Sequence, residues 1–453
     1  MRCYRRVPEN WEGLASADPQ ADNRTICDKA RPVFSCFETL NRSAFRMLFE
    51  TFSQRSHTTL RAVLGMVCVT LLWTFLSAGE AESLYGKRSL PEWREFVKTQ
   101  SLPALGTPET VHGLMEIVAD PGAPWTDRRQ FALTLGRIGP PAVDAVPLFK
   151  KLLKNQEANP MTAQLWSLKA LGLLGTTGQA AAGDVLPFLQ DARQPFLLRA
   201  TAMETLARIA PDQGTTLTAL IELLKSDEQL PDNQQANELR RASAEALSLL
   251  GPQASPALPE LIRALHSDWP ILQRSAATAL GAMGPRGELA IPPLADLILF
   301  GESNDSREAA AEALGAIGKP ALPALAYLLQ DEEELVRRLA IRGLGKSVES
   351  TAAAEILEAV LQDDSSVMRV ESAKTILLLP GNPRQEEAAI QVLLIGLQST
   401  EREVRMTAYR SLQGEAARLK SHRQELQAIA NTPDVSAQTR LAARRILNLV
   451  NEH

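Results

Sequence analysis

The side chains that could act as nucleophiles or metal ligands are few and scattered. The five histidines, His57, His112, His266, His422 and His453, stand in no HExxH frame and at no metal-ligand spacing from one another. All four cysteines, Cys3, Cys27, Cys36 and Cys68, precede residue 70, so the rest of the chain has no thiol nucleophile, disulfide or Cys-ligated zinc. Gly-rich fragments such as GTTG and GPRG follow no predicted strand, which argues against a phosphate loop. These residues therefore predict no catalytic site, no cofactor and no metal site.

An apolar run near the N-terminus predicts a targeting element. Residues 62–78 carry no charge over 17 positions, Arg55 and Arg61 precede them, and Glu80 and Glu82 follow. We interpret residues 60–81 as a signal peptide or a single membrane anchor, with the remainder on the extracytoplasmic side and cleavage near residue 80. A buried helix of a soluble cytoplasmic protein is the alternative.

The segment before this run is longer than an ordinary leader. Residues 1–59 are polar and show no clear periodicity, and Met47 would give a leader of normal length. We expect residues 1–59 to be disordered, or residues 1–46 to be untranslated.

The charge of the chain limits its partners. The formal net charge is -5, and residues 80–453 alone carry -8. Non-specific nucleic-acid binding requires a basic surface, so we expect no nucleic acid among the partners.

Leucine, or isoleucine in one unit, recurs at equivalent positions every 30 to 41 residues along the chain. We call these positions the leucine column. Its members are Leu135, Leu171, Leu206, Leu247, Leu280, Leu314, Leu344, Ile376, Leu412 and Leu447. That period is typical of stacked helical hairpins. Glycine-containing breakers follow the leucine in five units, such as GRIGPP at 136 and GAIGKP at 315, and a polar spacer at 226–237 is predicted to be a surface loop.

A second column lies seven residues before the leucines. It holds Arg128, Arg199, Arg240, Arg307, Arg337, Arg369, Arg405 and Arg440, with Gln164 and Gln273 in the other two units. Seven residues are two helical turns, so each arginine and leucine share one face. We interpret this column as a structural ladder rather than an anion-binding surface, because a planar guanidinium suits partly buried bidentate pairing.

The repeats resemble HEAT repeats. Their short, Ala-rich motif "ALG-IG-P" is similar to that of repeats in the phycobilin-lyase-like subgroup. The pairs Asp331–Arg337 and Asp363–Arg369 match the spacing of six residues in that family. The resemblance implies an all-α fold, an α-solenoid superhelix of about ten HEAT-like hairpins over 127–453. Residues 82–126 would then be a linker and degenerate capping helices.

Enzymes of this fold class give the main alternative function. Deoxyhypusine hydroxylase uses His-Glu dipeptides to bind iron, and no histidine here precedes a glutamate. A bilin lyase or related enzyme, and a soluble adaptor, are kept as alternatives.

The resemblance also implies that one helix of each hairpin lines a concave surface. The outward column on the second helices of the units holds Lys151, Asp191, Glu222, Arg263, Asp296, Tyr327 and Glu358, then Ile395 and Ala428. We call it the ridge. Its mixed charges and apolar end favour another protein or a peptide as the ligand. The sequence therefore predicts a non-catalytic protein-binding scaffold that touches a membrane only through residues 62–78.

Overall fold

The computed structural model describes residues 85–154, 160–212, 214–225, 234–380 and 382–452. The chain divides between Ser83 and Leu84, and every described residue belongs to the second unit. The predictions for residues 1–59 and 60–81 lie outside the described residues.

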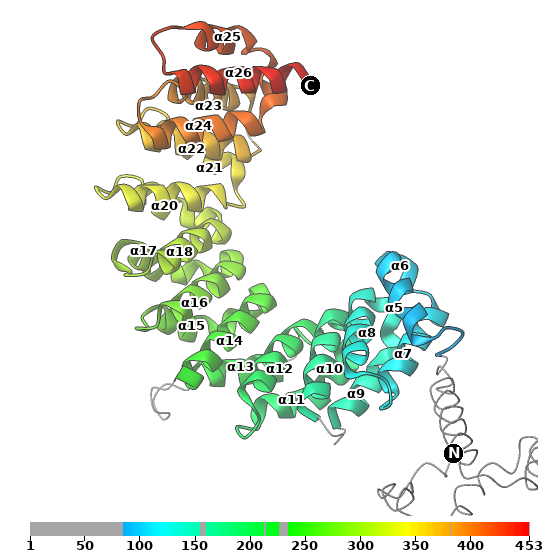
Figure 1. Cartoon of the computed structure of the whole chain (residues 1–453). Helices are drawn as coiled ribbons and strands as arrows, with labels where there is room; N and C mark the ends of the chain where they lie inside the picture. Colours follow the sequence, from blue (N-terminus) through cyan, green and yellow to red (C-terminus); the bar gives the residue numbers. More distant parts are fainter. Residues whose placement is uncertain (1–84, 155–159, 213, 226–233, 381, 453) are drawn as a thin grey trace, which may run out of the picture. The chain divides into compact units, whose positions relative to one another are not determined.

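The second unit is all-α, as predicted. Its described residues form no β-strand, and their only bridge joins Tyr85 to Arg88. The arginine column lies on the even-numbered helices α8 (Trp125–Ile138), α10 (Pro160–Leu174), α12 (Phe196–Ile209), α14 (Gln234–Leu250), α16 (Pro270–Ala282), α18 (Asn304–Ile317), α20 (Glu334–Gly345), α22 (Ser366–Leu378), α24 (Arg402–Gly414) and α26 (Ala437–Glu452). The odd-numbered helices are α7 (Pro108–Ala119), α9 (Val146–Lys154), α11 (Ala182–Gln190), α13 (Gly214–Lys225), α15 (Leu258–Leu265), α17 (Ile291–Phe300), α19 (Leu322–Leu328), α21 (Ser350–Val360), α23 (Pro383–Gly396) and α25 (Arg423–Asn431). Figure 1 shows them stacked in chain order.

The helices pair in a different phase from the predicted one. The odd-numbered helices pack along the even-numbered helix that follows them, from α7 with α8 to α25 with α26, except that α23 packs more extensively on α22 than on α24. The hairpin is therefore an odd-numbered helix followed by an even-numbered helix that holds the arginine column, and there are ten such pairs in the described residues. Helix α7 packs on α8 in the first of these pairs, and the assignment of residues 82–126 to a linker and degenerate capping helices stays a prediction.

Successive even-numbered helices approach one another to backbone contact. A Cβ atom built on Gly136 would lie 2.7 Å from the carbonyl oxygen of Ala170, and one on Gly281 would lie 2.8 Å from the Cα atom of Ala313. Successive odd-numbered helices pack less closely. The inner row of a curved stack is the closely packed one, so the predicted place of the ridge on a concave surface is not confirmed.

Glycine makes the turns that leave the even-numbered helices. Gly175, Gly251 and Gly284 have φ between 57° and 62°, a conformation that costs glycine little. Short 3₁₀ segments follow, including η2 (Gly175–Ala181), η3 (Gly251–Ala257) and η4 (Gly284–Ala290). The glycine caps thus act as the sequence predicts.

The polar spacer is shorter than predicted. Residues 226–233 lie outside the described residues, but Gln234 to Asn237 form the first turn of α14. Gln and Ala are good helix formers, so these residues extend the helix although few of them reach the core.

The N-terminal helices close the end of the stack. Helix α5 (Leu90–Thr99) buries Trp93, whose indole N–H donates to the carbonyl of Tyr85 at 2.9 Å, and α6 (Leu102–Leu105) follows it. Arg94 on α5 makes a bidentate pair with Asp127 on α8, at 2.8 and 2.6 Å. A buried aromatic side chain and a bidentate ion pair hold α5 to the first hairpin.

Candidate protein-binding surfaces

The arginine column joins the two helices of each hairpin. Seven of the eight arginines donate to main-chain carbonyls of the preceding helix or of the turn that follows it. The pairs are Arg128 to Val118, Arg240 to Leu224, Arg307 to Ile298, Arg337 to Asp331, Arg369 to Asp363, Arg405 to Ser399 and Arg440 to Pro433. Val118, Leu224 and Ile298 lie in the last turn of a helix, where carbonyls lack partners within the helix and carry partial negative charge that a guanidinium can compensate. The other four acceptors lie in the turn between the two helices.

The aspartates six residues before the arginines have a different role from the predicted one. Arg337 binds the main-chain oxygen of Asp331 at 2.8 Å, whereas the Asp331 carboxylate accepts the main-chain N–H of Glu333 at 2.8 Å. Arg369 likewise binds the main-chain oxygen of Asp363. The aspartate shapes the turn, and the arginine then binds its backbone, so no side-chain ion pair forms between them.

The remaining three positions of the arginine column are Gln164, Gln273 and Arg199. The two glutamines make the same kind of bond to a main-chain carbonyl, whereas Arg199 does not. Gln164 donates to the Leu153 carbonyl at 3.1 Å, and Gln273 donates to the Ser267 carbonyl at 2.8 Å. The Nε atom of Arg199 is buried without a hydrogen-bond partner. Burial lowers the pKa of the Arg199 guanidinium from its ordinary value, against the opposing charge of Asp191.

The ridge residues reach the surface of successive odd-numbered helices. Lys151, Glu222, Arg263, Asp296 and Tyr327 are exposed, whereas Asp191 and Glu358 are partly buried. Large apolar side chains are also exposed on this row: Tyr327 at 69%, Ile395 at 65%, and Phe300, one turn after Asp296, at 79%.

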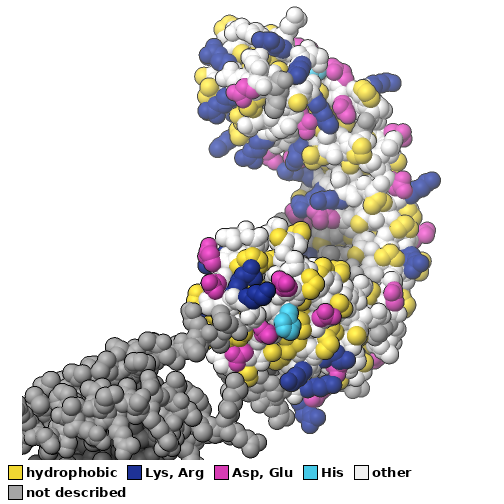
Figure 2. Space-filling model, turned by 90° about the vertical axis from the view of Figure 1, so that its right-hand side faces the viewer, with side chains coloured by type: hydrophobic (Ala, Val, Ile, Leu, Met, Phe, Trp, Pro, Cys, Tyr) yellow, Lys and Arg dark blue, Asp and Glu magenta, His cyan; other side chains and the backbone are white. Residues whose placement is uncertain are grey.

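A second surface, missed in the sequence, lies on the even-numbered helices five residues after the arginine column. We call it the stripe. Three middle members are acidic, and the last four are basic: Glu204, Glu245 and Glu312, then Arg342, Lys374, Arg410 and Arg445. The sign changes between α18 and α20, where Arg342 forms ion pairs with Glu308 and Glu312 at 2.8 and 2.9 Å. In Figure 2, Lys and Arg side chains gather toward the end of the body that holds α24 and α26.

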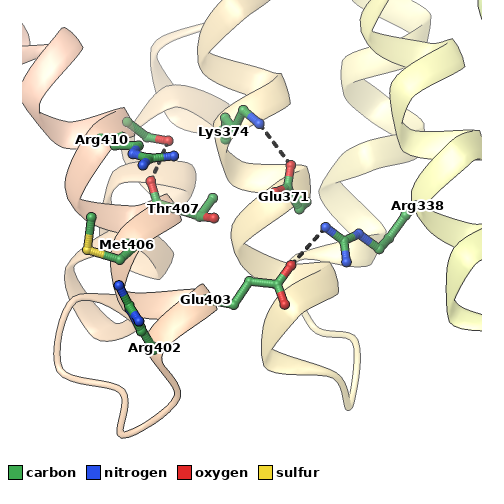
Figure 3. A pocket seen from close by; sticks show the side chains of 9 residues that line it. Arg338, Glu371, Lys374, Arg402, Glu403, Met406, Thr407 and Arg410 are labelled. Atoms are coloured by element: carbon green, nitrogen blue, oxygen red, sulfur yellow. Dashed lines mark hydrogen bonds and ion pairs between the residues drawn. The ribbon is translucent and has the colours of Figure 1, made fainter.

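The basic part of the stripe borders a surface hollow of about 630 Å³. Side chains from α20, α22 and α24 line it, among them Arg338, Lys374, Arg402, Met406 and Arg410 (Figure 3). The spacing of these side chains was available in the sequence, but it becomes one surface only when the even-numbered helices are known to be neighbours.

The middle of the array resembles a known protein family. Residues 291–376 match the HEAT-repeat family. This stretch runs from α17 to α22 and holds Arg307, Arg337 and Arg369. The closer resemblance to the phycobilin-lyase-like subgroup stays a prediction. No curated protein sequence matches the chain significantly.

Solved structures of helical repeat proteins resemble the chain at low identity. Importin beta matches with a TM-score of 0.44 at 13% identity, covering 95% of this chain and 60% of importin beta. Yeast importin-beta (Kap95p) matches with a TM-score of 0.44 at 14% identity, over 80% of this chain and 57% of that protein. The Escherichia coli protein YibA matches with a TM-score of 0.33 at 17% identity, over 58% and 91%. The chain thus spans less than two thirds of the importins, and these likenesses assign it no partner.

Two further findings concern the described residues alone. None of their helices combines the length and the apolar character needed to cross a membrane. They also contain no group of three or more His, Cys, Asp or Glu side chains placed to hold a metal ion.

Proposed function

We propose that the chain is a non-catalytic scaffold that binds another protein or a peptide. The observation that carries the proposal is the row of large apolar side chains on the odd-numbered helices, Phe300, Tyr327 and Ile395, each more than 60% exposed. They stand among the charged side chains of Asp296 and Arg263 on successive hairpins. Aromatic anchors surrounded by polar groups are characteristic of protein interfaces.

The proposal includes the place where the scaffold works. The uncharged run at 62–78, with Arg61 before it and Glu80 after it, supports export or tethering by residues 60–81. Fractionation of the C-terminally tagged chain tests this part: we expect a membrane-bound chain or a product that starts near residue 80. Full-length chain in the soluble cytoplasmic fraction would contradict it.

The ridge gives the first test of binding. The triple variant Arg263→Ala, Asp296→Ala and Tyr327→Ala should unfold within about 0.5 kcal/mol of the parent per substitution, because exposed side chains contribute little to stability. It should capture partners from the native envelope fraction at least tenfold less well in a quantitative pull-down. Tyr327→Ala alone should account for most of the loss, since buried aromatics dominate interfaces.

A matched triple variant outside both the ridge and the stripe, Arg129→Ala, Glu288→Ala and Lys319→Ala, is the control. Each of these side chains is exposed, as the substituted ridge residues are. Equal capture by the parent and the ridge variant would show that the ridge is not the binding surface. A parent chain that captures nothing above background would contradict the scaffold function itself.

A further inference from the structure

The hollow on α20, α22 and α24 holds more positive than negative charge. Arg338 pairs with Glu403 at 2.8 Å, and Lys374 pairs with Glu371 at 3.0 Å. These two pairs are drawn in Figure 3. The guanidinium groups of Arg402 and Arg410 have no hydrogen bond or ion pair with any described residue, although both line the same hollow. Four cations therefore share the site with two carboxylates.

The excess charge continues on the next even-numbered helix. Arg445 on α26 holds the stripe position that Arg410 holds on α24, and the exposed Arg444 precedes it. Helix α26 packs against α24, so these cations extend the basic surface beyond the hollow. Like charges at neighbouring positions repel, and a bound anion would remove that cost. Concentration of unpaired arginines at one end of a chain with a net charge of -5 is not required by the fold.

We propose that the hollow and the basic part of the stripe bind an acidic segment of a partner protein. This inference rests on the proposed scaffold function and names the chemistry of one partner. The segment's carboxylates would pair with Arg402, Arg410 and Arg445, and an apolar side chain would cover Met406, which is 37% exposed. Arginine suits such contacts because its planar group binds a carboxylate with two hydrogen bonds.

The two carboxylates of the hollow favour a peptide over a nucleic acid. Glu371 and Glu403 lie among the cations and would repel the evenly charged phosphates of a polynucleotide. A peptide can turn its main-chain N–H groups toward them, since an N–H donates to a carboxylate. It can also place neutral side chains between its acidic ones. The mixed composition of the hollow therefore selects a protein segment.

The spacing of the stripe suggests the form of that segment. Packed helices lie about 8–10 Å apart, so stripe residues on successive even-numbered helices repeat at about that distance. An extended polyproline II chain has three residues per turn and rises about 3.1 Å per residue, which places every third side chain on one face about 9 Å apart. An acidic residue at every third position would then meet one stripe cation per hairpin.

The experiment measures binding of a defined probe to the full-length chain. The probe is a fluorescein-labelled 18-residue peptide of six Glu-Pro-Leu repeats, followed by fluorescence anisotropy at low salt. We expect saturable binding that weakens as salt rises, because exposed charges are screened. Arg402→Glu with Arg410→Glu should weaken binding at least tenfold, and the milder Arg402→Gln with Arg410→Gln should weaken it about threefold.

The controls isolate the site from the net charge of the chain. Arg384 on α23 and Arg423 on α25 are exposed and have no polar partner among the described residues, so Arg384→Glu with Arg423→Glu changes the net charge equally. This pair should change the Kd less than twofold. A peptide with Lys in place of Glu should not bind, and a 12-nucleotide oligothymidylate should bind at least tenfold more weakly than the acidic peptide.

Each of the following results would overturn the inference: no saturable binding of the acidic peptide, equal losses in the two Glu double variants, or equal affinity for the oligonucleotide. The proposed function fails separately. If the parent chain captures partners through the ridge but does not bind the acidic peptide, the scaffold stands and this inference alone falls. Thermal melts of each variant accompany the titrations, and an Arg402/Arg410 Gln variant that is folded but binds like the parent also contradicts the site.

Discussion

Replacing Gly315 by alanine should lower the free energy of unfolding by about 2–3 kcal/mol, the upper part of the range for overpacked cores. A Cβ atom on Gly315 of α18 would collide with the main-chain carbonyl of Gly343 on α20. The collision is with backbone, so no side chain can rotate away. Helices α18 and α20 would have to separate, and the contacts between two hairpins would weaken together, because each hairpin of an array packs on its neighbours. Urea denaturation followed by circular dichroism measures the loss.

Gly183 supplies the matched control for this prediction. It lies in the first turn of α11 and is exposed, and a Cβ atom built there would meet no neighbouring element within 4 Å. Gly183→Ala should leave stability unchanged or raise it by up to about 1 kcal/mol, since alanine restricts the unfolded chain more than glycine does. If both variants unfold alike, α18 and α20 are not in backbone contact.

The period and type of the helices could be predicted from sequence, but the phase of the hairpins could not. The Leu314 and Arg307 columns mark one helix in every unit, and the breakers mark its end. Both turns of a two-helix repeat are short, however, so periodicity alone does not show which turn closes a hairpin. Contacts decide it: Arg307 reaches back to Ile298 on α17, and α17 packs along α18.

The place of the ridge on a concave surface stays a prediction. The ridge, which includes Tyr327, was placed on a concave surface from the order of helices in the family, whereas the even-numbered helices form the closely packed row. The stripe could not be recognised from the sequence, because its members become neighbours only when the even-numbered helices are stacked. Glu312 and Arg342 are 30 residues apart in sequence, and only the contact between α18 and α20 makes them a pair. A side chain whose role depends on a neighbouring hairpin can be assigned that role only when the packing of the helices is known.

The spacing of Asp331 and Arg337 shows a subtler limit. Opposite charges six residues apart across a turn suggested a side-chain ion pair, yet each group satisfies a main-chain partner instead. Turns and helix ends leave backbone N–H and C=O groups without partners. A hydrogen bond from a charged side chain to such a group stabilises the fold more than an exposed ion pair does. Sequence patterns of charged residues reveal partners poorly where backbone groups compete for the same side chains.

Replacing Arg307 by alanine should lower the free energy of unfolding by about 2–4 kcal/mol, because it removes a charged hydrogen bond and leaves a buried acceptor without a partner. The Arg307 side chain is 10% exposed, and its Nε donates to the Ile298 carbonyl at 2.7 Å. Its outer nitrogen also binds both oxygens of Glu333, at 3.1 and 3.2 Å. Arg337→Ala should cost less, about 1.5–2 kcal/mol, since both of its acceptors lie in a turn that water can reach.

Two further substitutions measure separately what the carbonyl contact and the Glu333 contact of Arg307 contribute to stability. Glu333→Ala removes only the half-exposed ion pair and should cost less than about 1 kcal/mol. Arg307→Gln should recover about half of the loss seen in Arg307→Ala, because Gln273 at the same position donates to the carbonyl of Ser267. Urea denaturation of these variants and of the exposed control Arg274→Ala gives the ranking. If Arg307→Ala is as stable as the parent while capture of partners falls, the arginine column is a binding surface and its structural role is wrong.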